Sequence, residues 1–355
     1  MNEQDSPETP DDTDHQDGDT DHRDGDVPAS VWSVAGAGAD AAAEAKASGT
    51  SVWATAAAAD AAVAADTASV VGPSLSGRQR FWRRFKRQRP ALVALSFIVF
   101  VTLVAIFAPV IAPADPNSQS LRDNLLAPSW DHWLGTDELG RDVLSRLIFA
   151  ARLSLLAAVQ AVGVGVALGV LPGLVAGYLG KKVDLVIMRI TDAVMSFPPL
   201  ILAIAIVGVL GPNLTNAMIA IGIVFAPRFV RLVRGTVLAV REETFIEASR
   251  SIGTPTFTII RRHILPNVMS PLVVQISLAA GFAMLAEASL SFLGLGAQPP
   301  DASWGVMLGR GFREISRAPW LVLAPGAAVA LSVLSLNILG DGIRDSIGRE
   351  VRRVK

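Results

Sequence analysis

Residues 153–180 read LSLLAAVQAVGVGVALGVLPGLVAGYLG and contain no charged side chain over 28 positions. A helix crosses the hydrocarbon core of a bilayer with about 20 apolar residues, so this stretch predicts a membrane-spanning helix long enough to tilt. Pro172 predicts a kink within it, because proline removes a backbone donor. Five further stretches have a similar composition: 91–112, 193–210, 214–227, 267–286 and 318–340.

The shortest of these stretches is 214–227, with only 14 residues. It reaches across a membrane only if the helix continues past Pro227, with arginine side chains extending toward the lipid headgroups. The other stretches have 18 residues or more. The predicted fold class is therefore all-α, a polytopic membrane protein with six transmembrane helices.

The composition supports this fold class. Hydrophobic residues make up 51% of the 355-residue chain, charged residues make up 18%, and the mean hydropathy is +0.44. Six helices buried inside a soluble protein are the alternative, which such a composition disfavours. The chain has no cysteine, which excludes disulfides, thiolate metal sites and a cysteine nucleophile.

The net charge of −1 is the sum of two regions of opposite charge. Residues 1–77 hold 15 acids and 2 bases, whereas the remainder holds 17 acids and 29 bases. The first region is acidic and then alanine-rich, and it predicts a disordered tail because it offers little apolar surface to offset the ordering entropy. A calcium loop starting at Asp17 would need Gly and Glu where His22 and Pro28 stand, so no metal site is predicted.

Lysine and arginine cluster before the first stretch, after the second and fourth, and in the C-terminal tail. Basic residues remain on the cytoplasmic side, so the pattern predicts that both termini are cytoplasmic. The predicted organisation has five parts: the tail 1–77, a basic segment with the first helix at 78–113, an extracytoplasmic segment at 114–145, a core of five helices at 146–342 that includes a cytoplasmic segment at 240–266, and a basic cytoplasmic tail at 343–355.

Small residues recur every fourth position in the second stretch, which predicts a close helix contact. The positions lie along one slowly drifting face of the helix. The contact is either within the chain or with a partner subunit, and the sequence does not separate the two. The stripe consists of Gly165, Gly169, Gly173 and Gly177.

Glu287 stands near the outer end of the fifth stretch. A lone acid in a membrane helix is costly and faces a cavity or a partner, which predicts a role in a transport pathway. Hydration at the membrane interface is the alternative. No other ionisable side chain is expected deep within a span, which disfavours a secondary transporter driven by protons or sodium.

The segment between the fourth and fifth stretches is too apolar for a solvated linker, and it predicts two short amphipathic helices joined by a sharp turn. Gly253 suits the end of the first helix, and Thr254 is expected to cap the second, with Pro255 at its first position. Pro266 marks the entry to the fifth stretch. The apolar face needs cover, either from the chain's own helix ends or from a soluble partner.

This segment resembles the EAA loop of ABC importer permeases. The resemblance rests on Glu247-Ala248-Ser249, on Gly253, and on Leu265-Pro266. Two positions depart from the family pattern: Ser249 replaces an alanine and His263 replaces an isoleucine. RHILPN at 262–267 is similar to the peptide-importer branch, so the second departure points to that branch.

Further motifs resemble the DppC/OppC-type subunit of dipeptide and oligopeptide importers, over about residues 78–349. They are HWLGTDELGRD at 132–142, FPP at 197–199, EASLSFLGLGAQPP at 287–300 and NILGDGIRD at 337–345. The resemblance implies a type I importer permease with no catalytic site. It also implies a second permease of the DppB/OppB type, two ATPase subunits that bind ATP and Mg²⁺, and an extracytoplasmic substrate-binding protein. No nucleic-acid partner is expected.

The chain itself shows no catalytic chemistry. GYLGKK at 177–182 lacks the spacing of a phosphate-binding loop, and no nucleophile with a base in reach is evident, which disfavours an intramembrane enzyme. The resemblance implies that the 240–266 loop couples to the ATPase through Glu247, Ala248, Ser249, Gly253, Thr254, Pro255 and Pro266. Glu247 either bonds an ATPase residue or caps its own helix.

The outer segment is a candidate surface for the binding protein. Trp133 suits either that contact or the membrane interface, and Asp137 and Arg141 are spaced to pair locally on a helical turn. The resemblance implies a substrate among dipeptides, longer peptides, glutathione, nickel and haem, with dipeptides and oligopeptides favoured.

Overall fold

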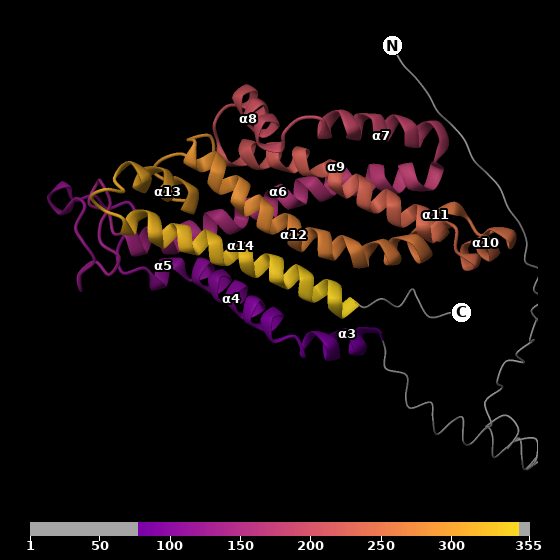
Figure 1. Cartoon of the computed structure of the whole chain (residues 1–355), viewed down its shortest axis with the longest axis horizontal. Coiled ribbons are helices and arrows are strands. Elements are labelled where there is room, and N and C mark those ends of the chain that lie inside the picture. The colour runs from indigo at the N-terminus through magenta and orange to yellow at the C-terminus, as the bar shows by residue number, and fades with distance from the viewer. Residues whose placement is uncertain (1–76, 348–355) are drawn as a thin grey trace, which may run out of the picture. The chain divides into compact units, whose positions relative to one another are not determined.

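The computed structural model describes residues 77–347, so the predicted tail at 1–77 lies, except for its last residue, outside the described part. Within that part the secondary structure is helical, apart from one isolated antiparallel bridge between Thr136 and Asp142. Five helices are long and apolar enough to cross a membrane. They are α4 (Arg89–Ile106), α6 (Val143–Leu179), α9 (Leu214–Arg241), α12 (Leu265–Phe292) and α14 (Trp320–Ile347), and Figure 1 shows them side by side.

The third predicted span is broken, which corrects the expectation of one continuous helix at 193–210. Two helices, α7 (Lys181–Met195) and α8 (Pro199–Leu210), meet there at 91°. Pro198 and Pro199 explain the break, because proline has no N–H to donate and forces the residue before it out of the α region. With 12 residues, α8 is about 18 Å long, so only the bent pair together supplies a sixth span.

The fourth span, by contrast, is a single helix. α9 continues through Pro227 to Arg241, which confirms that the helix extends beyond its short apolar stretch. Asn213 caps its first turn, with the side-chain oxygen accepting a bond from the amide of Thr215 at 2.8 Å. The added length brings several arginines into the helix.

Other helix boundaries also differ from the predictions. α4 ends at Ile106, and a separate short helix, α5 (Ala108–Ile111), follows it. α6 begins at Val143, ten residues before the uncharged stretch, because Asp142 caps it by accepting from the amide of Ser145 at 2.7 Å. α14 runs to Ile347, so the beginning of the predicted C-terminal tail is helical.

The glycine stripe of α6 packs against α9 within the chain, which decides between the two readings of that stripe. A Cβ at Gly169 would lie 2.4 Å from the Cβ of Phe229, and one at Gly177 would lie 2.7 Å from the Cβ of Val237. The contact is reciprocal, because a Cβ at Gly222 of α9 would lie 2.5 Å from the Cβ of Val164 of α6. Two backbones that touch in this way leave no room for a partner subunit at the stripe.

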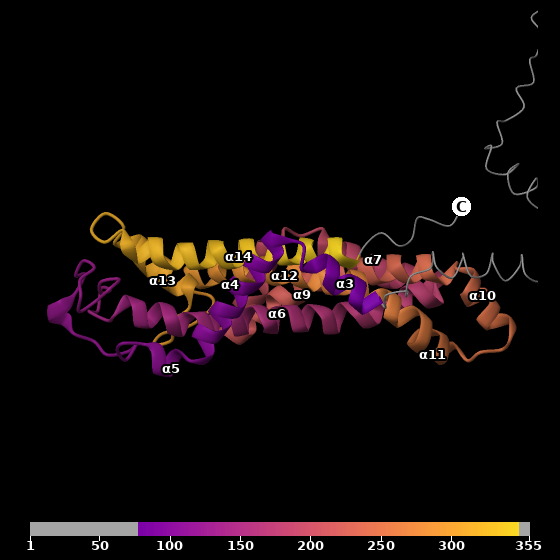
Figure 2. The same ribbon diagram turned by 90° about the horizontal axis from the view of Figure 1, so that it is seen from below.

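The short elements lie at the two ends of the helix bundle. α10 (Thr244–Ser251) and α11 (Thr256–Ile259) lie at one end, whereas α13 (Trp304–Arg313) lies at the other, as Figures 1 and 2 both show. Another short helix, α3 (Gly77–Phe85), precedes α4. The expected cytoplasmic and outer segments are therefore separated by the full length of the long helices.

Candidate coupling loop and outer segment

The predicted pair of short helices between α9 and α12 is present. α10 ends in a turn, α11 follows, and a π-helical segment η2 (Ile260–Ile264) leads without interruption into α12. Ile246 and Ile259 are buried and attach the two short helices to the bundle, whereas Ile252 is 82% exposed and Phe257 is 72% exposed. The chain's own helix ends thus cover one side of the loop and leave the other side open.

Gly253 closes the turn after α10 with a φ of +75°, a conformation that glycine adopts without strain. Its amide donates to the carbonyl of Arg250 at 2.9 Å, and the amide of Thr254 donates to the carbonyl of Ser249 at 3.1 Å. These two bonds form a Schellman motif, which satisfies carbonyls left free at the helix end. The expectation that Gly253 ends the first helix is confirmed.

The start of α11 differs from the prediction by one residue. Pro255 is the cap residue with extended backbone angles, and the helix begins at Thr256, without a capping bond from a side chain. Thr254 does not cap, because Pro255 occupies the N-cap position and no side chain accepts from the first turn of α11. Pro266 lies where it was expected, in the first turn of α12.

Two ring contacts also position the loop, one with the end of α6 and one between α10 and η2. The guanidinium of Arg250 lies 5.7 Å from the ring centroid of Tyr178 at the end of α6, and the rings of Phe245 and His263 lie 5.8 Å apart. Glu247 and Ala248 are exposed on the same helix, and the carboxylate of Glu247 makes no hydrogen bond or ion pair within residues 77–347. The structure therefore does not show Glu247 capping its own helix.

Asp137 and Arg141 form the predicted local pair in the outer segment, with Arg141 Nε donating to Asp137 Oδ2 at 2.7 Å. Both side chains are buried, so they are not part of an exposed surface for a binding protein. The other oxygen of Asp137 accepts from the amides of Leu139 and Arg141 and holds the turn closed. Trp133, at 67% exposure, is the candidate that remains on the surface.

Arg146 is a buried residue of this cluster that the sequence analysis missed. It lies 3.7 Å from Asp137 and donates to the carbonyl of Pro116 at 2.9 Å. The sequence gives no sign that Arg146 is buried, because it is a charged residue that precedes the uncharged stretch at 153–180. Asp137 thus pairs with two buried arginines, which makes it a structural centre of the outer segment.

Glu287 is buried inside the chain, at 1% exposure, so it is not exposed to water at the membrane interface. Ser291 donates to it at 2.7 Å and Ser154 of α6 donates to it at 3.3 Å. The amide of Trp304 in turn donates to Ser154 at 3.3 Å. Glu287 therefore joins α12, α6 and the start of α13, which corrects the alternative of hydration at the interface, whereas its role in a transport pathway stays a prediction.

Comparison with known families supports the resemblance. Residues 166–353 match the family described as binding-protein-dependent transport system inner membrane component, and residues 76–128 match the N-terminal TM domain of oligopeptide transport permease C. The chain belongs to the binding-protein-dependent ABC importer permeases. Such a permease is a multi-pass protein of the inner membrane.

The permease is also similar to curated proteins. It is 47% identical over 273 residues to the glutathione transport system permease protein GsiD of Escherichia coli O6:K15:H31 (strain 536 / UPEC), which covers 77% of this chain and 90% of that protein. GsiD of Shigella boydii serotype 4 (strain Sb227) gives the same values. A solved structure of the inward-facing methionine ABC transporter MetNI aligns with a TM-score of 0.49 and 19% identity, covering 58% of this chain and 98% of that chain.

Family membership places the permease in an ABC importer with a second permease, ATPase subunits and a binding protein. It also argues against a stand-alone secondary transporter. In this family ATP hydrolysis belongs to the separate ATPase subunits. Among the described residues no group of three or more His, Cys, Asp or Glu side chains is arranged to hold a metal ion.

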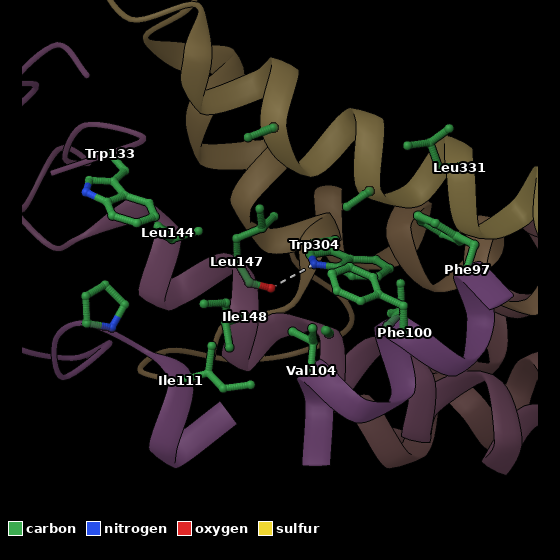
Figure 3. A pocket seen from close by; sticks show the side chains of 15 residues that line it. Phe97, Phe100, Val104, Ile111, Trp133, Leu144, Leu147, Ile148, Trp304 and Leu331 are labelled. Carbon is green, nitrogen blue, oxygen red and sulfur yellow. Dashed lines mark hydrogen bonds between the residues drawn. The ribbon is translucent and has the colours of Figure 1, made fainter. Parts of the chain in front are cut away.

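An apolar groove of about 720 Å³ opens between α4, α6 and α14 of the permease. Figure 3 shows Phe97, Phe100 and Val104 facing Leu147 and Trp304 across it, with the indole N–H of Trp304 donating to the carbonyl of Leu147 at 3.1 Å. The lining side chains are apolar. Such a groove suits hydrocarbon and offers no group that would bind a charged peptide.

Proposed function

We propose that this permease is one of two membrane subunits of an ATP-driven importer of short peptides, and that it forms half of the translocation pathway. The proposal rests chiefly on its 47% identity, over 90% of their length, to relatives named as glutathione permeases. The match to an oligopeptide permease segment at residues 76–128 supports the same substrate class. Glutathione is a tripeptide, so the two observations agree on a short peptide.

The element from α10 to α11 is the proposed contact with an ATPase subunit. Its exposed side, with Ile252 and Phe257, offers an apolar surface that a groove on a soluble partner would cover. The packing of Tyr178 against Arg250 ties that surface to α6, so a displacement of the loop is transmitted to a long helix. Coupling requires the nucleotide state to change this contact, because a partner shifts an equilibrium only through differential interactions.

Glu247, Ala248, Ser249, Gly253, Thr254, Pro255 and Pro266 remain the residues proposed for this coupling. Gly253 shapes the turn, and Glu247 is exposed and available to an ATPase residue. ATP and Mg²⁺ are proposed to bind the partner ATPase subunits and not this chain. The loop then acts as a lever that carries no nucleotide itself.

The orientation follows from the same proposal. The α10–α11 end faces the cytoplasm, both termini are cytoplasmic, and the opposite end with Trp133 faces the binding protein. The second permease is proposed to be of the DppB/OppB type. The abundance of arginine toward the α10–α11 end agrees with the cytoplasmic side of a membrane protein.

Reconstitution tests this function. The permease, its second permease, the ATPase subunits and the binding protein are placed in vesicles, and uptake of labelled glutathione, a dipeptide, a longer peptide, haem and nickel is compared with and without ATP. ATP-dependent uptake of a peptide is expected only with the full set of subunits. Uptake of nickel or haem alone, or uptake by this chain without nucleotide, would overturn the proposal.

A further inference from the structure

Arg228 stands halfway along α9, within its membrane-spanning part. At 1.5 Å per residue, it lies about 21 Å from Leu214 in a helix about 42 Å long. The hydrocarbon core is about 30 Å thick, so the middle of α9 lies inside it whichever end faces the cytoplasm. An arginine at that depth is costly unless its side chain reaches the lipid headgroups or faces a cavity or a partner.

Two arginines that follow Arg228 at helical spacing have partners on α7. Arg231 Nη2 donates to Asp192 Oδ1 at 2.7 Å, and Arg234 pairs with Asp184. Arg228 is exposed, and its guanidinium makes no hydrogen bond or ion pair with any residue in 77–347. The described chain thus supplies carboxylates for two of the three guanidinium groups and none for the third.

Two aromatic rings hold Arg228 in place. Its guanidinium carbon lies 5.7 Å from the ring centroid of Phe225 and 5.5 Å from that of Phe282 on α12. Cation–π contacts position the group but leave its N–H donors free. Phe282 is itself 51% exposed, so a cation and an aromatic ring are presented together on the surface formed by α9 and α12.

We propose that Arg228 is a carboxylate-binding residue of the translocation pathway and that Phe282 contacts the apolar part of the passing peptide. This rests on the proposed function, because a short peptide carries a carboxylate at its C-terminus. The planar guanidinium pairs with a carboxylate through two parallel hydrogen bonds. A site of one cation and one ring binds weakly enough to release its substrate, which passage through a pore requires.

A labelling experiment tests whether Arg228 faces an aqueous pathway. The chain contains no cysteine, so Arg228→Cys introduces a single thiol. In the assembled importer, with wild type as the blank, we expect a membrane-impermeant thiol reagent to label this position at least ten-fold faster than Val93→Cys in at least one nucleotide state. Val93 is a matched control on α4, with an apolar side chain that is 70% exposed. Equal, slow labelling of both positions would overturn the assignment to a pathway.

A transport experiment tests the carboxylate contact, with glutathione as the probe. We expect Arg228→Gln to lower ATP-driven uptake at least ten-fold while the complex still assembles and hydrolyses ATP, and Arg228→Lys to restore part of the uptake. Arg231→Gln is the control. It also removes one positive charge, one turn away from Arg228, but Arg231 already has Asp192 as its partner. Unchanged uptake in Arg228→Gln would overturn the proposal. Loss of the second permease on purification would do the same, because it assigns Arg228 to that subunit contact.

The two proposals fail differently. A wild-type importer that carries no peptide removes the proposed function. A wild-type importer that carries glutathione, together with an equally active Arg228→Gln variant, removes only the carboxylate contact.

Discussion

The amide of Thr254 donates to the carbonyl of Ser249 at 3.1 Å, across the turn that Gly253 makes between α10 and α11. This bond aligns the two short helices at the end of the bundle. It forms only because the residue between them has positive φ, at +75°. The geometry of the loop therefore depends on a backbone conformation and not on a packed side chain.

Gly253→Val is expected to abolish ATP-driven uptake while the permease still inserts in the membrane. A residue with a Cβ in the left-handed region costs about 1–2 kcal/mol, and valine is stiffer still, so the turn rearranges. No atom lies within 4 Å of the added Cβ, so the bundle itself has no reason to unfold. Uptake by reconstituted importer and membrane content by immunoblot measure the two effects.

Gly253→Asn is the matched control, because asparagine tolerates positive φ better than other residues with a side chain. It is expected to retain most of the uptake. Wild-type uptake in Gly253→Val would contradict the role of this turn as a lever.

Gly169→Ala is expected to destabilise the permease by about 1–3 kcal/mol, the usual cost of overpacking a tight core. The added methyl would lie 2.4 Å from the Cβ of Phe229 and 2.7 Å from the carbonyl oxygen of Ala226, both on α9. Gly163→Ala on the same helix is the control, because no atom lies within 4 Å of its Cβ. Thermal unfolding in detergent should separate the two variants, and equal midpoints would contradict the α6–α9 contact.

Asp137→Asn is expected to cost about 3–5 kcal/mol, the range for removing one partner of a buried ion pair. Arg146 would then be buried without a carboxylate and Arg141 would retain only Glu138, at 3.5 Å, although asparagine still accepts the amide bonds of the turn. Limited proteolysis from the outer side should show an opened segment at 114–145. Asp131→Asn, an exposed neighbour without a bond of its own, should leave proteolysis unchanged.

Glu287→Gln is expected to keep both the stability and the uptake of the permease, because an amide continues to bond Ser154 and Ser291. Glu287→Leu leaves those hydroxyls without their partner, which costs about 1–3 kcal/mol for each buried group left unsatisfied. Thermal stability and uptake are measured for both variants. A glutamine variant that is stable yet altered in uptake would contradict this expectation and would support a role for Glu287 in the transport pathway.

The sequence predicts those features that depend on local composition. Uncharged runs of sufficient length predict α4, α6, α12 and α14, and Gly253 with Pro255 predicts the turn of the coupling loop within one residue. The prediction of one continuous helix at 193–210 was wrong, because the hydropathy of that stretch does not indicate the bend at Pro198 and Pro199. Hydropathy adds contributions along the chain, whereas a bend depends on the backbone of two residues.

The sequence alone predicts membrane insertion, the helical class and the ABC importer family. These predictions depend on the length of apolar stretches and on short motifs, and both consist of residues that are neighbours in the chain. Side-chain partners between distant segments required the tertiary structure. Only the packing of α6 on α9 assigns Gly169 to an internal contact, only the fold buries Glu287 beside Ser154, and only the pairing of α9 with α7 distinguishes Arg228 from Arg231. Each of these outcomes depends on which residues of another helix stand within a few ångströms, and no local pattern contains that information.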